Sequence, residues 1–369
     1  MRLIRQLHLY TGLTLSLVLF LIALSGAALL YKLEYWQLQY PALRGVDALP
    51  GSDNQAQAIA AASRLFGDRL ESLKMPEPGV SAYHAYLADH GEALMTIDTH
   101  ALIDEWQLRD RLMGVLFDIH VHLMAGETGE LVAGGIGLVA AVMAITGLAL
   151  WWPTRRAFRW RSLWPGGWQR RHLLAWHRDM GMVLSPLLLV FLLTGSGMVF
   201  YAQVQSLLNG LFGDPVPTVA PASAAKPVVN PETSSQQPLP SARTLAAVNA
   251  VFPDARLMFY YTDALAQGYH RFRLRRACEL HPNGLTFIYT NAVSGDIAHT
   301  SDACAMPPGE RLTRMIYPLH AGKAGTETWR FLGLITALVL VGLSLSGVAT
   351  YIQRIRNANP RSRASHTSL

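Results

Sequence analysis

The sequence has little charge for its length. Asp, Glu, Lys and Arg together make up 15% of its 369 residues, whereas soluble domains carry about 25%. Hydrophobic residues make up 51%, and the mean hydropathy is +0.21. These proportions argue against a soluble enzyme and predict a membrane protein.

Cysteine is nearly absent as well. The two cysteines, Cys278 and Cys304, fall in one predicted outer region, where a single pair in an oxidising compartment most simply forms a disulfide. A metal site built on two cysteines is less favoured. The sequence has no Cys-x-x-Cys-His motif, which excludes covalently attached c-type haem. It also has no G-x-G-x-x-G after a strand, so no flavin or NAD site is expected in this chain.

Four apolar runs are long enough to cross a bilayer, whose hydrocarbon core takes about 20 helical residues. They cover 13–31, 131–152, 182–201 and 331–351. The first follows Arg2 and Arg5 and so resembles a secretory signal. Its apolar stretch is longer than the usual signal core of about 7–15 residues, and its pattern recurs around His177. We therefore expect a retained span.

Basic residues flank these runs unevenly. They precede the first run, fill the segment between the second and third, and follow the fourth: Arg2, Arg5, Arg155, Arg156, Arg159, Arg161, Arg170, Arg171, Arg178, Arg354, Arg356, Arg361 and Arg363. The positive-inside rule therefore places both termini and the loop at 153–177 in the cytoplasm. Trp160, Trp164 and Trp168 beside these arginines are typical of interfacial anchoring, so we expect no nucleic-acid partner.

This topology divides the chain into eight segments. They are the first span with its cytoplasmic N-terminus at 1–31, an outer module at 32–130, the second span at 131–152, a cytoplasmic basic loop at 153–177, the third span at 178–201, a second outer module at 202–328 with a proline-rich linker at 214–240, the fourth span at 329–353, and a cytoplasmic tail at 354–369. The chain is thus predicted to contact the lipid bilayer and to expose two periplasmic modules.

Each outer module is predicted to combine a helix with a small sheet. In the first, a helix covers 54–66, strands cover 81–87 and 92–97, and 98–100 leads into a helix that ends near His122. In the second, a helix covers 241–251, with strands at 255–261, 270–277 and 285–291. The fold class is therefore an integral membrane α-helical four-span bundle with two periplasmic α+β modules. The recurring order indicates a tandem internal duplication whose repeats are parallel.

Four histidines stand in repeat register with these spans. His8 and His177 are each followed one helical turn later by a glycine, Gly12 and Gly181, and then at one shared distance by a hydroxyl–glycine pair, Ser25-Gly26 and Thr194-Gly195. His120 and His320 are likewise followed, at a longer shared distance, by Thr146-Gly147 and Ser346-Gly347. A straight helix that covered this longer distance would extend about 40 Å. The glycines at 126–129 and 322–325 therefore predict that these two histidines lie on separate short helices.

These histidines are the candidate ligands of two b-type haems. Neutral imidazoles from two facing helices can hold such a haem. His8 and His177 begin spans that run in the same direction, which predicts a cytoplasmic-side haem between them, and His120 with His320 predicts a periplasmic-side haem. Gly12 and Gly181 lie one turn deeper and leave room for a macrocycle or a close helix.

Alternatives to these ligands remain open. His122 competes with His120, and His172 is a lower-ranked rival of His177. Interfacial histidines are often structural, and a duplication copies useful and useless residues alike. Ser25, Thr146, Thr194 and Ser346, the hydroxyl residues of the four pairs, are interpreted as small residues of helix packing whose hydroxyls bond to the backbone. The remaining histidines of the modules are expected at the surface, with a substrate site as the alternative for a few of them: His84, His90, His100, His270, His281 and His299.

Several of these motifs resemble those of the PepSY-associated transmembrane family over essentially the whole chain. They are Leu7-His8 with Gly12 and Ser25-Gly26, Thr146-Gly147 with Trp151-Trp152-Pro153, Trp176-His177-Arg178 with Gly181 and Thr194-Gly195, and Pro318-Leu319-His320-Ala321-Gly322. Within that family the chain is similar to di-haem siderophore reductases of the bacterial inner membrane. The resemblance implies PepSY-like modules, two bis-histidine b haems and His8, His120, His177 and His320 as ligands. The extra His122 departs from the family pattern.

The sequence thus predicts a membrane oxidoreductase. A cytoplasmic or membrane electron donor, a flavin reductase or a quinol, would reduce the first haem. The second would reduce a periplasmic ferric siderophore of the hydroxamate type and release Fe(II). One alternative is a non-redox envelope regulator that the spans only anchor. A siderophore transporter ranks last, because the spans contain almost none of the polar or charged residues that transport pathways need.

Overall fold

The computed structural model describes residues 1–45, 49–77, 79–214 and 238–358. The chain divides into two units. The first, which we call the membrane unit, comprises Met1–Leu30, Leu116–Tyr201 and Leu319–Leu369. The second, the sheet unit, comprises Tyr31–Val115 and Ala202–Pro318. Most of the predicted linker at 214–240 and of the tail at 354–369 lies outside the described residues.

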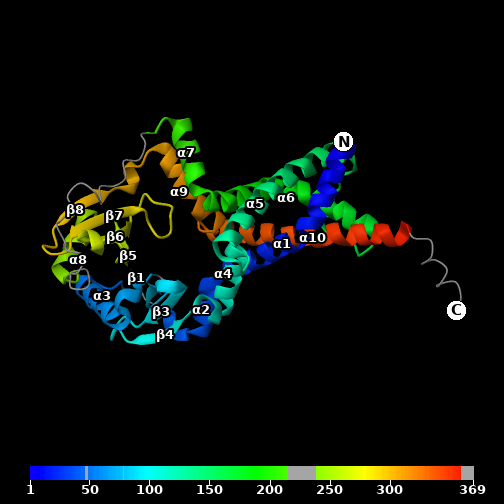
Figure 1. Cartoon of the computed structure of the whole chain (residues 1–369). Coiled ribbons are helices and arrows are strands. Elements are labelled where there is room, and N and C mark those ends of the chain that lie inside the picture. The colour runs from blue at the N-terminus through cyan, green and yellow to red at the C-terminus, as the bar shows by residue number, and fades with distance from the viewer. Residues whose placement is uncertain (46–48, 78, 215–237, 359–369) are drawn as a thin grey trace. The chain divides into compact units, whose positions relative to one another are not determined.

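Four helices of the membrane unit are long and apolar enough to cross a bilayer. They are α1 (Arg2–Leu29), α5 (Gly126–Trp151), α6 (Arg170–Val199) and α10 (Glu327–Ala358) (Figure 1). The four predicted spans are thereby confirmed. With 26 to 32 residues each, the helices run past the apolar windows into their polar flanks. The helix that contains the first span therefore begins at Arg2 rather than at 13.

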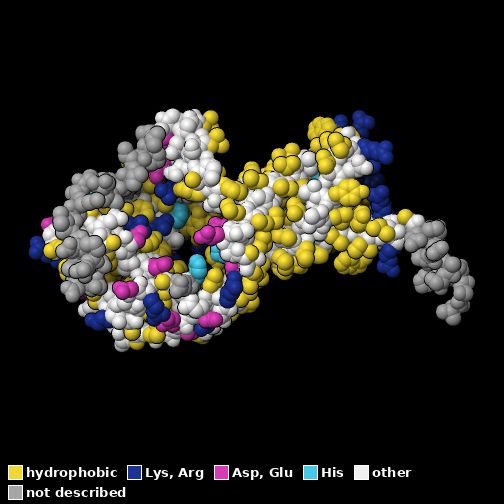
Figure 2. All heavy atoms as spheres, viewed as in Figure 1, with side chains coloured by type: hydrophobic (Ala, Val, Ile, Leu, Met, Phe, Trp, Pro, Cys, Tyr) yellow, Lys and Arg dark blue, Asp and Glu magenta, His cyan; other side chains and the backbone are white. Residues whose placement is uncertain are grey.

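The surface of the membrane unit suits a lipid environment. Large apolar side chains stay exposed along its helices, among them Leu17 (67%), Val142 (58%) and Leu345 (53%). Figure 2 shows hydrophobic side chains over its flank and Lys and Arg side chains gathered at one end. In water such a surface would be costly, whereas a bilayer covers it.

Two short helices precede spans α5 and α10. Helix α4 (Leu112–His122) is separated from α5, and α9 (Pro308–His320) from α10. The breaks contain left-handed residues, with φ of +62° at Met124, +59° at Gly126 and +70° at Gly322. The predicted separation of the histidine-bearing helices from the spans is therefore confirmed.

The sheet unit contains one antiparallel sheet of eight strands in the order β4-β3-β2-β1-β5-β6-β7-β8 (Figure 1). The strands are β1 (Leu70–Lys74), β2 (Tyr83–Leu87), β3 (Gly91–Met95), β4 (Leu102–Trp106), β5 (Arg256–Tyr261), β6 (Tyr269–Arg275), β7 (Thr286–Asn291) and β8 (Ile297–Ser301). Each predicted outer region does form a helix and strands, but the two regions share one sheet instead of forming separate ones. Strand β1 of the first half pairs with β5 of the second, with Leu73 opposite Tyr260, and one continuous sheet leaves no open edge between the halves.

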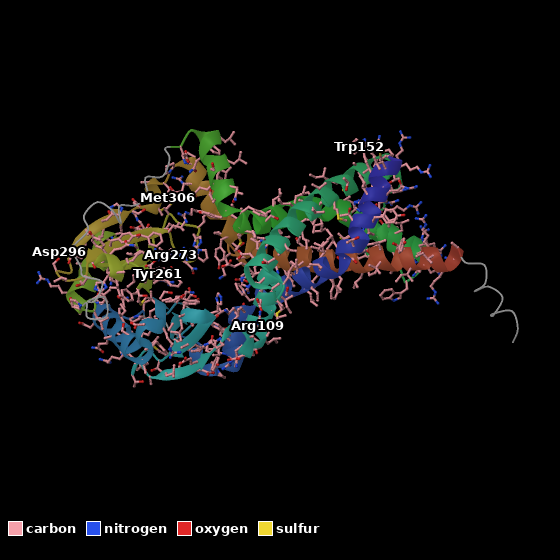
Figure 3. All side chains as sticks on the ribbon, in the orientation of Figure 1. Arg109, Trp152, Tyr261, Arg273, Asp296 and Met306 are labelled. Carbon is pink, nitrogen blue, oxygen red and sulfur yellow. A yellow bond between two sulfur atoms is a disulfide. The ribbon has the colours of Figure 1, made fainter. Side chains whose placement is uncertain are left out.

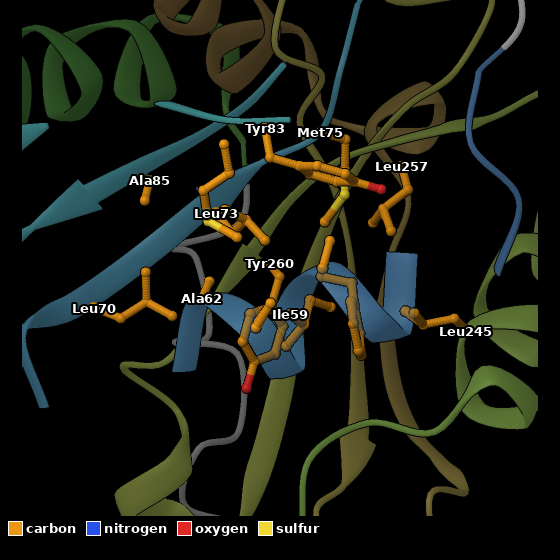
Figure 4. Packing of buried hydrophobic residues seen from close by; sticks show 14 of the residues in the cluster. Ile59, Ala62, Leu70, Leu73, Met75, Tyr83, Ala85, Leu245, Leu257 and Tyr260 are labelled. Carbon is orange, nitrogen blue, oxygen red and sulfur yellow. The ribbon is translucent and has the colours of Figure 1, made fainter. Parts of the chain in front are cut away.

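Helices α3 (Ser52–Phe66) and α8 (Ala242–Val251) cover one face of this sheet and build its core. Ile59 and Leu245 from the helices meet Leu73 and Tyr260 from the strands, all fully buried (Figure 4). Ser241 begins α8 as an N-cap, because its hydroxyl accepts a hydrogen bond from the Thr244 amide.

The remaining elements connect these parts. Helix α2 (Lys32–Gln39) follows α1, and α7 (Tyr201–Phe212) follows α6. The 3₁₀ helices are η1 (Pro41–Leu43), η2 (Gly67–Arg69), η3 (Ala88–His90), η4 (Leu108–Asp110), η5 (Trp152–Ala157), η6 (Trp160–Leu163), η8 (Leu265–Gln267) and η9 (Ala303–Ala305). A disulfide joins Cys278 to Cys304, whose Cα atoms are 6.1 Å apart.

The segment before His122 differs from its prediction. A helix was expected from 98–100 onward, but the chain forms strand β4 and the 3₁₀ helix η4 before α4 begins at Leu112. Strand β4 forms because its backbone pairs with β3, and Asp104 within it accepts hydrogen bonds from Tyr40 and Arg111. These partners are distant in sequence, so local propensity gave no sign of them.

Candidate functional site: two histidine pairs

His8 and His177 form the first pair. His8 lies near the start of α1 and His177 near the start of α6, and their ring centroids are 6.5 Å apart with the rings nearly perpendicular. The Nδ1 atom of His8 lies 3.0 Å from Thr146 Oγ1 on α5, and that of His177 lies 2.9 Å from Ser346 Oγ on α10. Each ring is thus held by a hydroxyl from a different span.

The hydroxyl partners favour the tautomer that carries its proton on Nδ1. Thr146 donates its only hydroxyl hydrogen to Met143 O at 3.0 Å, and Ser346 donates its own to Leu343 O at 3.1 Å. Each hydroxyl oxygen can then only accept from the imidazole, which places the proton on Nδ1. The Nε2 lone pairs of His8 and His177 are left to bind a metal.

His120 and His320 form the second pair. Their ring centroids are 5.9 Å apart and their planes are tilted by 35°. His120 Nδ1 donates to Ile22 O at 2.8 Å, and His320 Nδ1 donates to Phe191 O at 3.0 Å. Because a carbonyl only accepts, these rings too carry the proton on Nδ1 and present an unprotonated Nε2.

A glycine makes room for each of the four rings. A Cβ at Gly26 would lie 2.6 Å from Cε1 of His120, and one at Gly195 would lie 2.7 Å from Cε1 of His320. The fit is looser at the first pair, where the corresponding distances are 3.4 Å for Gly147 and 3.7 Å for Gly347. Side chains other than hydrogen are therefore excluded at Gly26 and Gly195 unless the histidines move.

The four hydroxyl–glycine pairs are thus part of the site, which the sequence interpretation missed. Ser25, Thr146, Thr194 and Ser346 were expected to serve helix packing and to bond to the backbone, and each does bond to a main-chain carbonyl of its own helix. Each also lies within 3.5 Å of a histidine Nδ1, which was not expected. The signal was present in the constant spacing between each histidine and the pair that follows it. That spacing relates each glycine to the histidine that precedes it in the sequence, whereas the contact is made to the other histidine of the same half of the chain.

The lower-ranked candidates lie elsewhere. His122 instead contacts the buried Asp118, with 3.1 Å between its Nδ1 and Oδ1 of the carboxylate. His172 lies beside Gly166 and Gly167. The predicted close-packing glycines face neighbouring helices, since a Cβ at Gly12 would lie 3.0 Å from Met143 and one at Gly181 would lie 3.7 Å from Leu343.

Each pair has the spacing that one shared metal ion requires. A metal bonded to two facing imidazoles at about 2 Å from each nitrogen separates the ring centroids by about 6 Å. The observed separations are 6.5 Å and 5.9 Å. The pairs lie at opposite ends of the bundle, because His8 lies near the start of α1 and Gly26, which contacts His120, lies near its end. The helical rise from His8 to Gly26 amounts to about 27 Å.

A buried carboxylate lies close to the first pair. Asp179 is fully buried on α6 and accepts hydrogen bonds from Trp151 Nε1 at 3.1 Å and from Arg178 Nε at 2.7 Å, as well as from Ser162. It ties α5 and η6 to the helix that carries His177.

A pocket of about 400 Å³ is lined by residues of α1 and α10, namely Tyr10, Tyr351, Arg354 and two aliphatic residues. Figure 3 labels Trp152, which follows α5 at this end of the membrane unit.

Three histidines of the sheet unit are buried rather than exposed as expected. His84 and His270 are 4% and 1% exposed, and His281 is 8% exposed. Burial lowers the pKa of His84 and lowers that of His270 to about 4. Burial opposes ionisation of Glu92, but its bond from His84 and the charge of Lys32 outweigh this and lower its pKa to about 2.

The sheet face opposite α3 and α8 carries aromatic and cationic side chains. Arg271 lies over the Tyr261 ring at 4.2 Å, and Arg273 donates to the Tyr261 hydroxyl at 3.3 Å (Figure 3). Arg271 is also paired with Asp263 at 2.8 Å. Such a surface offers ring faces and hydrogen-bond donors to a ligand.

Comparison with known proteins agrees with the architecture of the membrane unit. The model of the PepSY-associated TM region matches residues 5–354, which include both histidine pairs and all four spans. A search of curated proteins found no match to this chain. Since the family match covers nearly the whole sequence, the chain belongs to the PepSY-associated transmembrane family.

Proposed function

We propose that this protein carries electrons across the bacterial inner membrane through two b-type haems and reduces a ferric hydroxamate siderophore in the periplasm. His8 and His177 hold one haem, and His120 and His320 hold the other. The observation that carries this proposal is the presence, at each end of the bundle, of two imidazoles about 6 Å apart whose Nδ1 atoms bond to hydroxyl or carbonyl oxygens, which leaves each Nε2 atom for a metal.

The distribution of basic residues supports the orientation. Lys and Arg gather at one end of the membrane unit (Figure 2). That end holds the start of α1 and the end of α10 and therefore the His8–His177 pair. By the positive-inside rule this end faces the cytoplasm, which makes the His120–His320 pair the periplasmic one. The two halves share one order of elements, which supports a tandem duplication with parallel repeats.

The chain's own residues supply the haem ligands, orient those ligands and exclude water from the site. A bis-histidine haem, when bound, accepts and donates one electron at its iron. The histidines keep their protons on Nδ1, so that no proton has to leave before the metal is bound. The apolar helices keep water from the iron and lower the local dielectric, which tunes the potential.

The electron enters and leaves at opposite ends. A quinol or a cytoplasmic flavin reductase donates near the His8–His177 pair, where the pocket lined by Tyr10 and Arg354 is a docking place for the donor. At the other end a ferric chelate docks against the sheet unit and takes up one electron. Fe(III) becomes Fe(II), which hydroxamate oxygens hold far more weakly, so the iron is released and the ligand stays intact.

Optical spectra of single variants test this proposal. Purified protein should show a Soret band with sharp α and β bands on reduction. His8→Ala or His177→Ala should remove about half of the haem and stop reduction from the cytoplasmic side, and His320→Ala should spare the other haem. His172→Ala is the matched control and should keep both. A colourless, folded protein would contradict the proposal and favour a non-redox binding module.

A further inference from the structure

The two histidine pairs differ in what holds their Nδ1 atoms. In the His8–His177 pair the Nδ1 atoms lie against side-chain hydroxyls, Thr146 at 3.0 Å and Ser346 at 2.9 Å, and the carbonyls of Met143 and Leu343 are additional partners. In the His120–His320 pair the nearest acceptors are main-chain carbonyls, Ile22 at 2.8 Å and Phe191 at 3.0 Å. The repeat-equivalent hydroxyls of Ser25 and Thr194 lie farther away, at 3.5 Å and 3.4 Å.

The hydroxyl rotamers account for this difference. Ser25 and Thr194 bond most closely to the carbonyl four residues earlier on their own helices, Leu21 O at 2.7 Å and Val190 O at 2.6 Å. The carbonyl three residues earlier is then the nearest acceptor for the imidazole. Thr146 and Ser346 instead bond to the carbonyl three residues earlier, at 3.0 Å and 3.1 Å, which brings their oxygen atoms toward the rings.

We propose that Thr146 and Ser346 are positioning residues of the His8–His177 pair, and that main-chain carbonyls fill this role at the His120–His320 pair. The inference rests on the proposed haem ligation. A hydrogen bond from the distal ring nitrogen orients a ligand histidine and raises its basicity, which stabilises ferric iron. Removing the hydroxyls therefore takes away the close side-chain partners of the first pair, whereas the equivalent substitutions leave the closest partners of the second pair, the carbonyls, in place.

Two matched double variants test the inference in the full-length protein. Thr146→Val with Ser346→Ala removes both hydroxyls of the first pair, and Ser25→Ala with Thr194→Val removes both of the second. Midpoint potentials are measured by optical redox titration, and haem retention by transfer to apomyoglobin. The haem of the first pair is identified as the spectral component that His8→Ala lacks. In the first double variant its midpoint potential should become more positive, and its transfer to apomyoglobin should be about tenfold faster. The second double variant should leave both components unchanged.

Further variants separate positioning from packing. Ser344→Ala removes a hydroxyl on α10 that bonds to Leu340 O, two residues from Ser346, and should change nothing. Thr146→Ser, used in place of Thr146→Val, keeps the hydroxyl, so the protein should keep the wild-type potential. The unaffected haem serves as an internal measure of folding in every variant.

The outcomes are distinct. If both double variants shift their haems equally, or if neither does, the inference is overturned while the haem ligation stands. If the wild-type protein binds no haem, the proposed function fails and the inference fails with it.

Discussion

At the scale of single residues, the glycines beside the rings set the tightest constraint on the site. A methyl group at Gly195 would lie 2.7 Å from His320, whereas one at Gly347 would lie 3.7 Å from His177, an ordinary contact. The ring that lies against Gly195 is also hydrogen-bonded to the main chain at Phe191. It therefore cannot turn aside without losing that bond.

Gly195→Ala should accordingly displace His320 and remove the haem of that pair. Gly347→Ala, the equivalent change at His177, should retain both haems. Gly135→Ala on α5 is a matched control, because nothing lies within 4 Å of its added Cβ. Haem per chain from absorbance measures the effect, and a Gly195→Ala protein with two haems of unchanged spectrum would show that the ring is not confined as the structure indicates.

The candidate histidines could be predicted from the sequence, whereas the groups that hold them could not. His8, His120, His177 and His320 were found through their repeat register alone. The contacts of Thr146 with His8 and of Ser346 with His177 cross between helices. No spacing within one helix encodes such a contact, so the hydroxyls were assigned to packing.

At the scale of elements, the spans and the strands β2, β3, β5, β6 and β7 were predictable, whereas β1, β4, β8 and the pairing that joins all strands into one sheet were not. Four apolar runs define their helices through composition, independently of what each helix contacts. Strand β1 (LESLK) has neither a clear alternation nor a turn signal of its own. It becomes a strand because β2 pairs with it on one side and β5 on the other. Pairing with a strand that begins at Arg256 is a tertiary property, which is why two modules were predicted where one sheet exists.

Engineered cysteines test the junction of the two halves. Ser72 on β1 lies opposite Tyr261 on β5, and Cβ atoms of facing residues are about 5 Å apart. Ser72→Cys with Tyr261→Cys should form a disulfide that mass spectrometry of digested protein detects. Ser72→Cys with Tyr289→Cys on β7 should not. Absence of the first cross-link in folded protein would restore the prediction of two separate modules.

A buried histidine on β6 should make the stability of the sheet unit depend on pH. His270 is buried between the Tyr260 hydroxyl at 3.1 Å and Pro238 O at 3.0 Å, and burial lowers its pKa to about 4. The unfolded ring titrates near 6.5. Between these values only the unfolded chain binds the proton, so the free energy of unfolding falls as the pH drops from about 6.5 to about 4. The loss is about 3 kcal/mol.

The expected observation is a thermal midpoint of the full chain in detergent, followed by tryptophan fluorescence, that declines over this range. His270→Gln should reduce the slope without abolishing it, because burial also lowers the pKa of His84. Glu92, with a pKa of about 2, contributes only below about pH 4.5. An unchanged slope in His270→Gln would show that its ring is protonated in the folded protein.

At the scale of the whole molecule, the orientation in the membrane decides the direction of electron flow. Both ends of the chain should lie in the cytoplasm with the His8–His177 pair. A green fluorescent protein fused to the C-terminus should therefore fluoresce, and alkaline phosphatase at the same place should be inactive. The reverse pattern would place the basic end outside and would reverse the proposed electron path.

The most direct test of the proposal is the haem content of the purified full-length protein, measured as pyridine haemochrome per chain. Two histidine pairs, each with both Nε2 atoms unprotonated, predict two non-covalently bound b-type haems per chain, both low-spin when reduced. A value of one would leave one pair without the role assigned to it. A value of zero in folded protein would contradict the electron-transfer function altogether.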